Sequence, residues 1–382
     1  MVNRSKLNIL APVGYPWDFS GPRHSKNNVK RKRFVPFNRI RGGLDGFTVF
    51  NPVDTWSSDL IHAFNRIPLN AKRFVIGYES HLPRFFGNHS GSYEKFLYGQ
   101  LLSKRCKKIV GISRYAQNNF IEALDNADLK DEERSLLRGK LDIRYPNMDI
   151  PEWNNHGPVW EGEINLTFVG NHFSRKGGCT VLRMAELAFE QKLPYVFNIV
   201  SALQCGGSIW TDPSREEFYT PYLRLLSLPN VRHHKTLPNP EVMKLLERSH
   251  FSLLTTFADT FGYSAIESMA KGTPVICTNQ GALPEFISDG VNGFSLAPAT
   301  TQGAPDWRPD FNSRGNADFE QLFAGNVERL ATGAVKKLTQ ITNPDQYANM
   351  RKAAHNTAKD FFDANTASAY WDELYNVVLD RK

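Results

Sequence analysis

Short apolar runs alternate with segments of helical spacing along this chain, and that alternation constrains the fold more than any other feature. The pattern occupies the first half and resumes after residues 151–163. Strands that alternate with helices imply βαβ units and a parallel sheet. Residues 151–163 are polar and aromatic, contain Gly and Pro, and have no clear period, so they predict a linker. The chain of 382 residues is therefore expected to form two α/β domains.

The individual elements follow from apolar periodicity and from capping residues. Ser113, for example, is expected to cap a helix. We predict strands over 7–11, 47–50, 73–77, 108–112, 166–169, 195–200, 250–254, 274–277 and 294–296. We predict helices over 93–102, 114–124, 179–189, 238–247, 263–271, 318–330 and 344–378.

Composition and motifs exclude several classes of protein. No apolar run approaches the roughly 20 residues of a membrane helix, and the N-terminus lacks the apolar region of a signal peptide. The four cysteines are scattered and are typical of reduced thiols in a cytoplasmic protein. The sequence has no P-loop, no G-x-S-x-G elbow and no histidines with carboxylates at metal spacing. We therefore expect a cytoplasmic protein without metal or cofactor.

The charge is basic, with a net value of +7 and a pI near 9.1. Part of the excess is local, because residues 26–41 are rich in Lys and Arg and contain no acid. Such a segment is a solvated face, a surface for an anionic lipid or charged acceptor, or a nucleic-acid contact. No recognised nucleic-acid motif accompanies it. The first two interpretations are therefore favoured over the third.

Residues 259–276 carry the strongest chemical signal. Asp259 and Glu267 lie eight residues apart, Phe261 and Gly262 follow the first acid, and a helix leads to the second. A loop carboxylate, a bare glycine amide and a helix N-terminus thus converge. Carboxylates accept sugar hydroxyls, while a helix start offers N–H donors and a positive dipole end to phosphate.

Residues 166–178 carry the second signal. An apolar strand runs into Gly170, and the following loop ends in Arg175 and Lys176 before two glycines and a helix. Flexible backbone beside two cations and a helix start is suited to a diphosphate. An Arg fork and a Lys point charge neutralise leaving phosphates together.

Both segments resemble the retaining, family 4 glycosyltransferases, whose signature is two acids separated by seven residues, and the resemblance continues through 278–294. The resemblance implies the GT-B fold: two Rossmann-like domains with a cleft between them. Residues 1–150 would form the acceptor-binding domain, completed by a last helix over about 360–382 that crosses back. Residues 151–360 would bind the nucleotide sugar.

The resemblance also implies roles in the C-terminal half. Glu267 would accept ribose hydroxyls, Asp259 would bind the donor sugar, and Arg175 and Lys176 would act on the diphosphate. The other donor-binding candidates here are Gly170, Asn171, Phe261, Gly262 and Tyr263. Two positions depart from the family pattern. Asn171 stands where many members have Arg, and Asp259 stands where members usually have Glu.

In the N-terminal half the match is looser. Gly14 and Gly21 lie where the family's glycine loop approaches the donor phosphate, and His81 matches a His that contacts the transferred sugar. Arg23, His24 and Glu79 are the acceptor-binding candidates.

The expected function is transfer of a sugar from a nucleotide-diphosphate sugar to a glycan or lipid-linked acceptor in bacterial-type surface polysaccharide synthesis, with retention of configuration. The expected partners are the donor, that acceptor and an anionic membrane surface, but not nucleic acid, so the protein would be cytoplasmic or peripheral at the inner membrane face. The main alternative is a catalytically degenerate sugar-nucleotide-binding subunit that scaffolds a glycan assembly. A phosphorylase or soluble synthase, and a nucleic-acid binder, are further alternatives.

Overall fold

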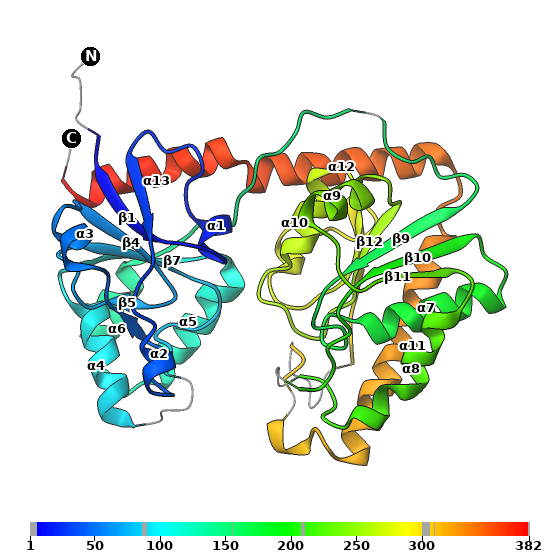
Figure 1. The fold of residues 1–382 in the computed structure, drawn as a ribbon, viewed down its shortest axis with the longest axis horizontal. Helices are drawn as coiled ribbons and strands as arrows, with labels where there is room; N and C mark the ends of the chain where they lie inside the picture. Colours follow the sequence, from blue (N-terminus) through cyan, green and yellow to red (C-terminus); the bar gives the residue numbers. More distant parts are fainter. Residues whose placement is uncertain are drawn as a thin grey trace. The chain divides into compact units, whose positions relative to one another are not determined.

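The computed structural model describes residues 6–85, 90–154, 156–207, 211–299, 306–308 and 310–380. The chain divides into two compact units (Figure 1). Unit 1 comprises Met1–Asp149 and Phe361–Lys382, and unit 2 comprises Ile150–Asp360. Within the described residues each unit holds a six-stranded sheet in which all neighbours are parallel. The predicted α/β class is confirmed.

The large sheet of unit 1 has the order β2-β1-β4-β6-β7-β8. Its strands are β1 (Asn8–Pro12), β2 (Asn28–Lys32), β4 (Leu60–Phe64), β6 (Phe74–Tyr78), β7 (Cys106–Gly111) and β8 (Leu141–Ile143). A small sheet pairs β3 (Phe47–Thr48) with β5 (Ile67–Pro68). The helices are α1 (Trp17–Ser20), α2 (Phe37–Ile40), α3 (Pro52–Trp56), α4 (Gly91–Leu102), α5 (Arg114–Asn126), α6 (Asp131–Gly139) and α13 (Ala364–Val378).

The sheet of unit 2 has the order β11-β10-β9-β12-β13-β14. Its strands are β9 (Ile164–Val169), β10 (Tyr195–Val200), β11 (Val231–His234), β12 (Phe251–Leu254), β13 (Val275–Thr278) and β14 (Gly293–Leu296). The helices are α7 (Gly178–Glu190), α8 (Thr220–Arg224), α9 (Asn239–Glu247), α10 (Tyr263–Ala270), α11 (Ala317–Thr339) and α12 (Pro344–Phe362).

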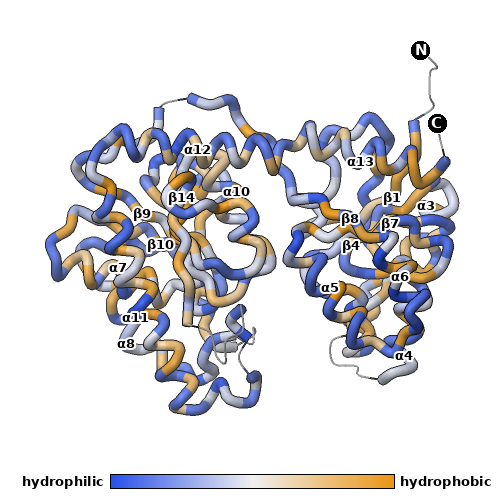
Figure 2. Tube along the Cα trace, turned by 180° about the vertical axis from the view of Figure 1, so that it is seen from behind, coloured by the Kyte–Doolittle hydropathy of each residue, from blue (hydrophilic) through white to orange (hydrophobic). Residues whose placement is uncertain are grey.

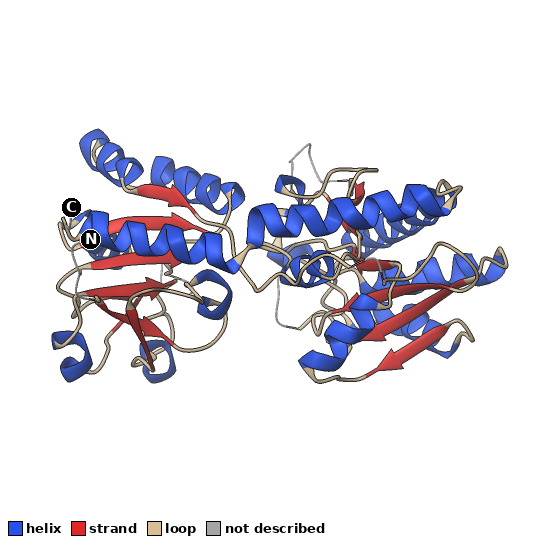
Figure 3. Cartoon of the chain, turned by 90° about the horizontal axis from the view of Figure 1, so that it is seen from above, coloured by secondary structure: helices blue, strands red, loops and turns tan. Residues whose placement is uncertain are grey.

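Helices flank the strands of each unit (Figure 3), and the apolar residues gather along the strands (Figure 2). In unit 2, α7 packs against α11 and α9 packs against α10. Strands buried on both faces lose the polar alternation of an open sheet, which is why β9, β10 and β12 were visible as apolar runs. Since helices cover the sheet of unit 2, the polar groups next to its strands that solvent can reach lie in the loops at the strand ends.

The last helix belongs to the core of unit 1. Trp371 and Tyr375 of α13 are 1% and 0% exposed and pack against residues of β1, β4, β6 and β7. The hydroxyl of Tyr375 lies 2.7 Å from Nδ1 of His62 in β4. Burial lowers the pKa of His62 to about 3, so the ring is neutral at physiological pH. The prediction that the C-terminal helix returns to the N-terminal domain is confirmed.

Several elements differ from prediction. Residues 28–32 of the basic segment form β2, an edge strand that was not predicted because its lysines and arginines resemble a solvated loop. The central strand β4 was missed because His62 interrupts its apolar run. Residues 344–378 form two helices instead of one. Asp363 separates them, because it bridges to Met148 and caps α13 through its side chain.

Candidate functional site

The sheet of unit 2 reverses its order beside β9, with β10 on one side and β12 on the other. Parallel α/β sheets bind ligands outside the carboxyl ends of the strands at such a reversal. The loops that leave β9 and β12 span residues 170–177 and 255–262. Both sequence signals therefore emerge at one edge of one sheet.

Hydrogen bonds to main-chain carbonyls hold these two loops together. The carbonyl of Arg175 accepts from the amide of Phe257 at 2.8 Å and from Oγ1 of Thr256 at 3.1 Å. The guanidinium of Arg175 donates to the carbonyl of Ala258. One backbone and two side-chain donors thus bind main-chain carbonyls across the two loops and fix the loops against each other.

Lys176 and Asp259 form the centre of the site. Nζ of Lys176 lies 3.0 Å from Oδ2 of Asp259, and their side chains are 19% and 9% exposed. The amide of Gly262 donates to Oδ1 of Asp259 at 3.3 Å. Burial acts to raise the pKa of Asp259, but Lys176 and Arg175 outweigh it and hold the pKa below its ordinary value. Asp259 is therefore a carboxylate acceptor at neutral pH.

Two glycines are required by this arrangement. A Cβ on Gly170 would lie 2.6 Å from Cδ of Lys176, so glycine lets the lysine stem cross the end of β9. Gly262 has φ +89°, and a Cβ there would lie 2.7 Å from Cδ2 of Leu283. Gly262 is also the residue before α10, so its backbone sets the direction of that helix.

Glu267 lies on α10, one turn into the helix. It accepts from Nδ2 of Asn239 at 3.4 Å. Burial raises the pKa of Glu267, while Asn239 and the charge of Lys176 act against that rise. Since Lys176 acts on both acids, the two carboxylates and the lysine share one electrostatic environment.

Phe261 and Tyr263 flank Gly262 but differ in environment. The Phe261 ring is fully buried and stacks on Phe286 with centroids 5.3 Å apart, so it is a core side chain. Its backbone hydrogen-bonds the carboxylate of Asp259. The amides around Phe261 and Gly262, expected to face the donor, are directed at Asp259 in this structure. Tyr263 is half-buried.

Asn171 begins the loop after Gly170 and is exposed. Its carbonyl accepts from the amides of Phe173 at 2.8 Å and Gln204 at 3.0 Å, so it connects the loops after β9 and β10. A cavity of about 280 Å³ opens beside these loops. It is lined by His172, Arg175, residues 204–207 and Asp212.

In unit 1, three of the predicted residues lie on loops after β1 and β6. Gly14 has φ +88° and an open space around its Cβ position. Glu79 accepts from Nδ2 of Asn65 at 3.2 Å and lies 3.6 Å from a guanidinium nitrogen of Arg84. His81 is exposed, with Nδ1 2.9 Å from Oγ of Ser80. The hydroxyl of Tyr15 lies 3.5 Å from Glu79 and joins the two loops.

Gly21 has a packing role in this structure, and its predicted role in donor binding stays a prediction. A Cβ there would lie 2.4 Å from the ring of Trp17, and its carbonyl accepts from the side chain of Asn147 at 3.0 Å. Asn147 is fully buried and also donates to the carbonyl of Phe19. The close packing that requires glycine here is internal to unit 1.

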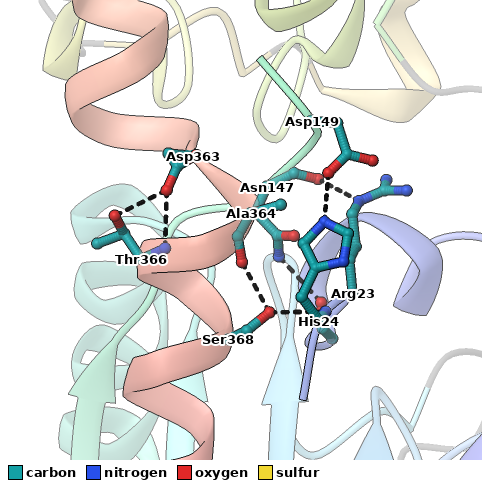
Figure 4. Close-up of polar contacts among 9 residues, drawn as sticks. Arg23, His24, Asn147, Asp149, Asp363, Ala364, Thr366 and Ser368 are labelled. Atoms are coloured by element: carbon teal, nitrogen blue, oxygen red, sulfur yellow. Dashed lines mark hydrogen bonds and ion pairs between the residues drawn. The ribbon is translucent and has the colours of Figure 1, made fainter. Parts of the chain in front are cut away.

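Arg23 and His24 lie beside the segment that leaves unit 1 (Figure 4). Nε of Arg23 donates to the carbonyl of Asn147 at 3.2 Å, and Nε2 of His24 lies 2.5 Å from Oδ1 of Asp149. The amide of His24 donates to Oγ of Ser368 in α13 at 2.9 Å. Their observed contacts fasten residues 147–149, and a role in acceptor binding stays a prediction.

Asn239 was missed by sequence reasoning, although a signal was present. It begins α9 shortly after β11, at the same carboxyl edge of the sheet. Because β11 was not predicted, that edge position was not recognised. In the described part of the chain, no three His, Cys, Asp or Glu residues gather as metal ligands. No helix in those same ranges is long and apolar enough to cross a membrane.

Comparison with known proteins gives a family match for part of the chain. Residues 149–304 match the family model of glycosyl transferases group 1. An uncharacterized 41.2 kDa protein in the cps region of Klebsiella pneumoniae is 25% identical over 237 residues, which cover 59% of this chain. The chain spans 58% of the length of that relative.

Two solved structures share the fold over nearly the whole chain. The glycosyltransferase from Rickettsia africae ESF-5 has a TM-score of 0.65 and 15% identity, and covers 99% of this chain and 100% of its own. Anabaena Alr3699/HepE, solved with UDP and glucose, has a TM-score of 0.60 and 14% identity, with 97% and 100% covered. The chain thus has the GT-B fold, and its residues 149–304 match the model of the glycosyl transferases group 1 family.

Proposed function

We propose that this protein is a retaining glycosyltransferase that moves a sugar from a nucleotide-diphosphate sugar to a glycan or lipid-linked acceptor. The observation that carries the proposal is the Lys176–Asp259 pair at the sheet reversal of unit 2, with Arg175 and Glu267 in the same electrostatic environment. The match of residues 149–304 to the group 1 family supports it. The Anabaena protein with the same fold was solved with UDP and glucose, which supports a nucleotide-sugar donor.

The roles follow from charge and position. Lys176 and Arg175 face the diphosphate and stabilise the negative charge that develops as it leaves. Asp259, a carboxylate held by Lys176, accepts hydroxyls of the donor sugar, and Glu267 accepts those of the ribose. The leaving phosphate itself takes the proton of the acceptor hydroxyl, so catalysis is chiefly positioning and electrostatics.

The other predicted residues complete the proposal. Gly14, Gly21, Gly170, Asn171 and Tyr263 line the donor, and His81 contacts the transferred sugar. The amides of Phe261 and Gly262 hold the carboxylate of Asp259 in place for the donor. Arg23, His24 and Glu79 face the acceptor. Arg175 and Lys176 take the place of a metal ion at the leaving group, so we propose a reaction without divalent cation.

The biological setting is proposed to be surface polysaccharide synthesis at the cytoplasmic face of a membrane. The support is the similarity to a protein in the Klebsiella cps region and the basic character of residues 26–41. A glycan under assembly on a lipid is the acceptor that fits this setting.

A thermal-shift panel of UDP, GDP, ADP and TDP, each with and without its sugars, tests donor binding. A donor at 100 times its Kd stabilises by about 2.7 kcal/mol. Lys176→Ala and Glu267→Ala should each abolish the shift. Lys244→Ala is the control, because this lysine of unit 2 is 63% exposed and pairs along its own helix with Glu241. A shift that survives in both site variants would move the site elsewhere.

The alternative is a degenerate donor-binding subunit, and two observations favour it. Asn171 brings no positive charge to the loop after β9, and its main chain serves local hydrogen bonds. Asp259 is one methylene shorter than the acid usual in the family. Release of nucleoside diphosphate from the donor, measured with and without acceptor, separates the two. A thermal shift without any turnover would support the subunit.

A further inference from the structure

One edge of unit 1 exposes large apolar side chains among lysines. Trp56 and Val53 of α3 are 80% and 76% exposed. Lys30 and Lys32 of β2, and Lys72 before β6, are exposed too. We call these five residues the lysine–tryptophan patch. An exposed apolar patch edged by polar groups marks an interaction surface more often than a single exposed side chain does.

The alternation of β2 places its two lysines on one side of the sheet. Side chains of a strand alternate between faces. Val29 packs against the core cluster that contains α13, and Arg31 pairs with Asp18. Lys30 and Lys32 therefore lie on the opposite face from α13. Nζ of Lys32 lies 3.9 Å from Oδ1 of Asp54 in α3, so the lysine face of β2 adjoins α3.

The short helix α3 is anchored so that its apolar residues face outward. Asn51 caps the helix by accepting from the amide of Val53 at 2.9 Å. Thr55 is buried and bonds to the carbonyl of Asn51 at 3.0 Å. Val53 and Trp56 are three residues apart and so lie on one side of the helix. Nζ of Lys72 lies 5.8 Å from the Trp56 ring centroid, which makes the patch continuous.

We propose that the lysine–tryptophan patch docks unit 1 on an anionic phospholipid bilayer. Tryptophan prefers the headgroup level, where its ring meets apolar chains and its N–H meets water. Lysines beside it are attracted by the negative surface potential of a cytoplasmic leaflet. The lysine–tryptophan patch supplies both the tryptophan and the lysines, and the whole chain has a net charge of +7. The docking proposal rests on the proposed function, because an enzyme that acts on a lipid-linked acceptor has to reach the membrane.

Binding to vesicles tests the proposal on the full-length chain. Sucrose-loaded vesicles of phosphatidylcholine, alone or with phosphatidylglycerol, are sedimented with the protein at low and high salt. We expect binding to the anionic vesicles, loss of binding at high salt, and none to the neutral ones. Trp56→Ser should lower the partition coefficient about tenfold. Each of Lys30→Ser and Lys32→Ser should lower it about fivefold.

Three controls separate this surface from unspecific apolar adsorption and from a general affinity for phosphate. Phe189→Ser removes a 50% exposed ring from unit 2 and should leave vesicle binding unchanged. Lipids brominated on their acyl chains should quench the fluorescence of the wild type more than that of Trp56→Ser. Duplex DNA at the same salt offers phosphate without an apolar layer and should not distinguish Trp56→Ser from the wild type.

Several outcomes would overturn the proposal. These are no binding to anionic vesicles, equal binding by Trp56→Ser, an equal loss in Phe189→Ser, or binding to DNA but not to vesicles. The donor thermal shift is measured on the same variants. An intact shift with no vesicle binding refutes the docking surface alone, while vesicle binding without any donor shift refutes the proposed transferase.

Discussion

Replacing Lys176 by Met tests whether the Lys176–Asp259 pair supports the fold of unit 2 as well as its site. The two charged atoms lie 3.0 Å apart, and both side chains are largely buried. Breaking a buried pair from one side costs about 3–5 kcal/mol because the other charge stays buried. Asp259 keeps the amide of Gly262 and the charge of Arg175. We therefore expect a loss at the lower end, about 3 kcal/mol.

The double variant K176M/D259N removes both charges. No charge is then left uncompensated, and the asparagine oxygen still accepts from Gly262. We expect about 2 kcal/mol of the loss to return, so that the two substitutions are far from additive. Urea titrations of the wild type, both single variants and the double variant measure this coupling. In thermal melts, K176M should unfold about 6–12 °C lower, at roughly 2–4 °C per kcal/mol for a domain of this size.

The dependence of stability on acidic pH independently tests the charge on Asp259. The pKa of Asp259 is lower in the folded protein than its ordinary value of 3.8. Its contribution to stability is therefore present above pH 3.8 and is lost as the pH falls through the folded pKa. The difference in stability between the wild type and D259N should shrink over that acidic range. A constant difference would contradict the charge assigned to Asp259.

Donor binding by the same four proteins separates the structural role of the Lys176–Asp259 pair from its functional role. The double variant should approach the stability of the wild type and still show no donor thermal shift, because both ligand-facing charges are gone. Two results would refute the reasoning. One is a K176M variant within about 0.5 kcal/mol of the wild type, which is the range of ordinary surface substitutions. The other is strict additivity of the two single losses.

Three further predictions concern two loop glycines, the buried His62 and the need for a divalent cation. Gly262→Ala should lower the free energy of unfolding by about 2–4 kcal/mol, because φ is positive and the added Cβ would meet Leu283. Gly14→Ala has a similar φ but open space around the Cβ, so it should cost only about 1 kcal/mol. Denaturant titration compares the two variants. The pKa of His62 falls from 6.5 to about 3 on folding. The unfolded chain therefore binds more protons than the folded chain below pH 6.5. Relative to His62→Gln, the free energy of unfolding of the wild type should fall by about 1.4 kcal/mol per pH unit toward pH 3. Urea titrations at stepped pH measure this, and parallel curves for the two proteins would refute it. Sugar transfer should persist in EDTA, and an absolute requirement for added Mg²⁺ or Mn²⁺ would refute the metal-free proposal.

Much of unit 2 was predictable from the sequence because its signals are local. Apolar runs identified β9, β10, β12 and β13 within a few residues, and the glycines beside Lys176 and Asp259 identified the loops that follow. The positions of β2 and β4 were not predictable in this way. A charged edge strand resembles a solvated loop, and a buried histidine interrupts the apolar pattern of a central strand.

The α/β class, the two sets of alternating elements and the residue types of the site follow from local sequence patterns, because each depends on neighbours within a few positions. Which residues meet depends on the fold of the whole chain. Lys176 pairs with Asp259 because β9 and β12 are adjacent in the sheet although far apart in the chain. The carbonyl of Gly21 accepts from the side chain of Asn147, which lies 126 residues later in the chain, for the same kind of reason. Contacts between distant segments are set by the order of strands and by packing, which no local pattern of residues encodes.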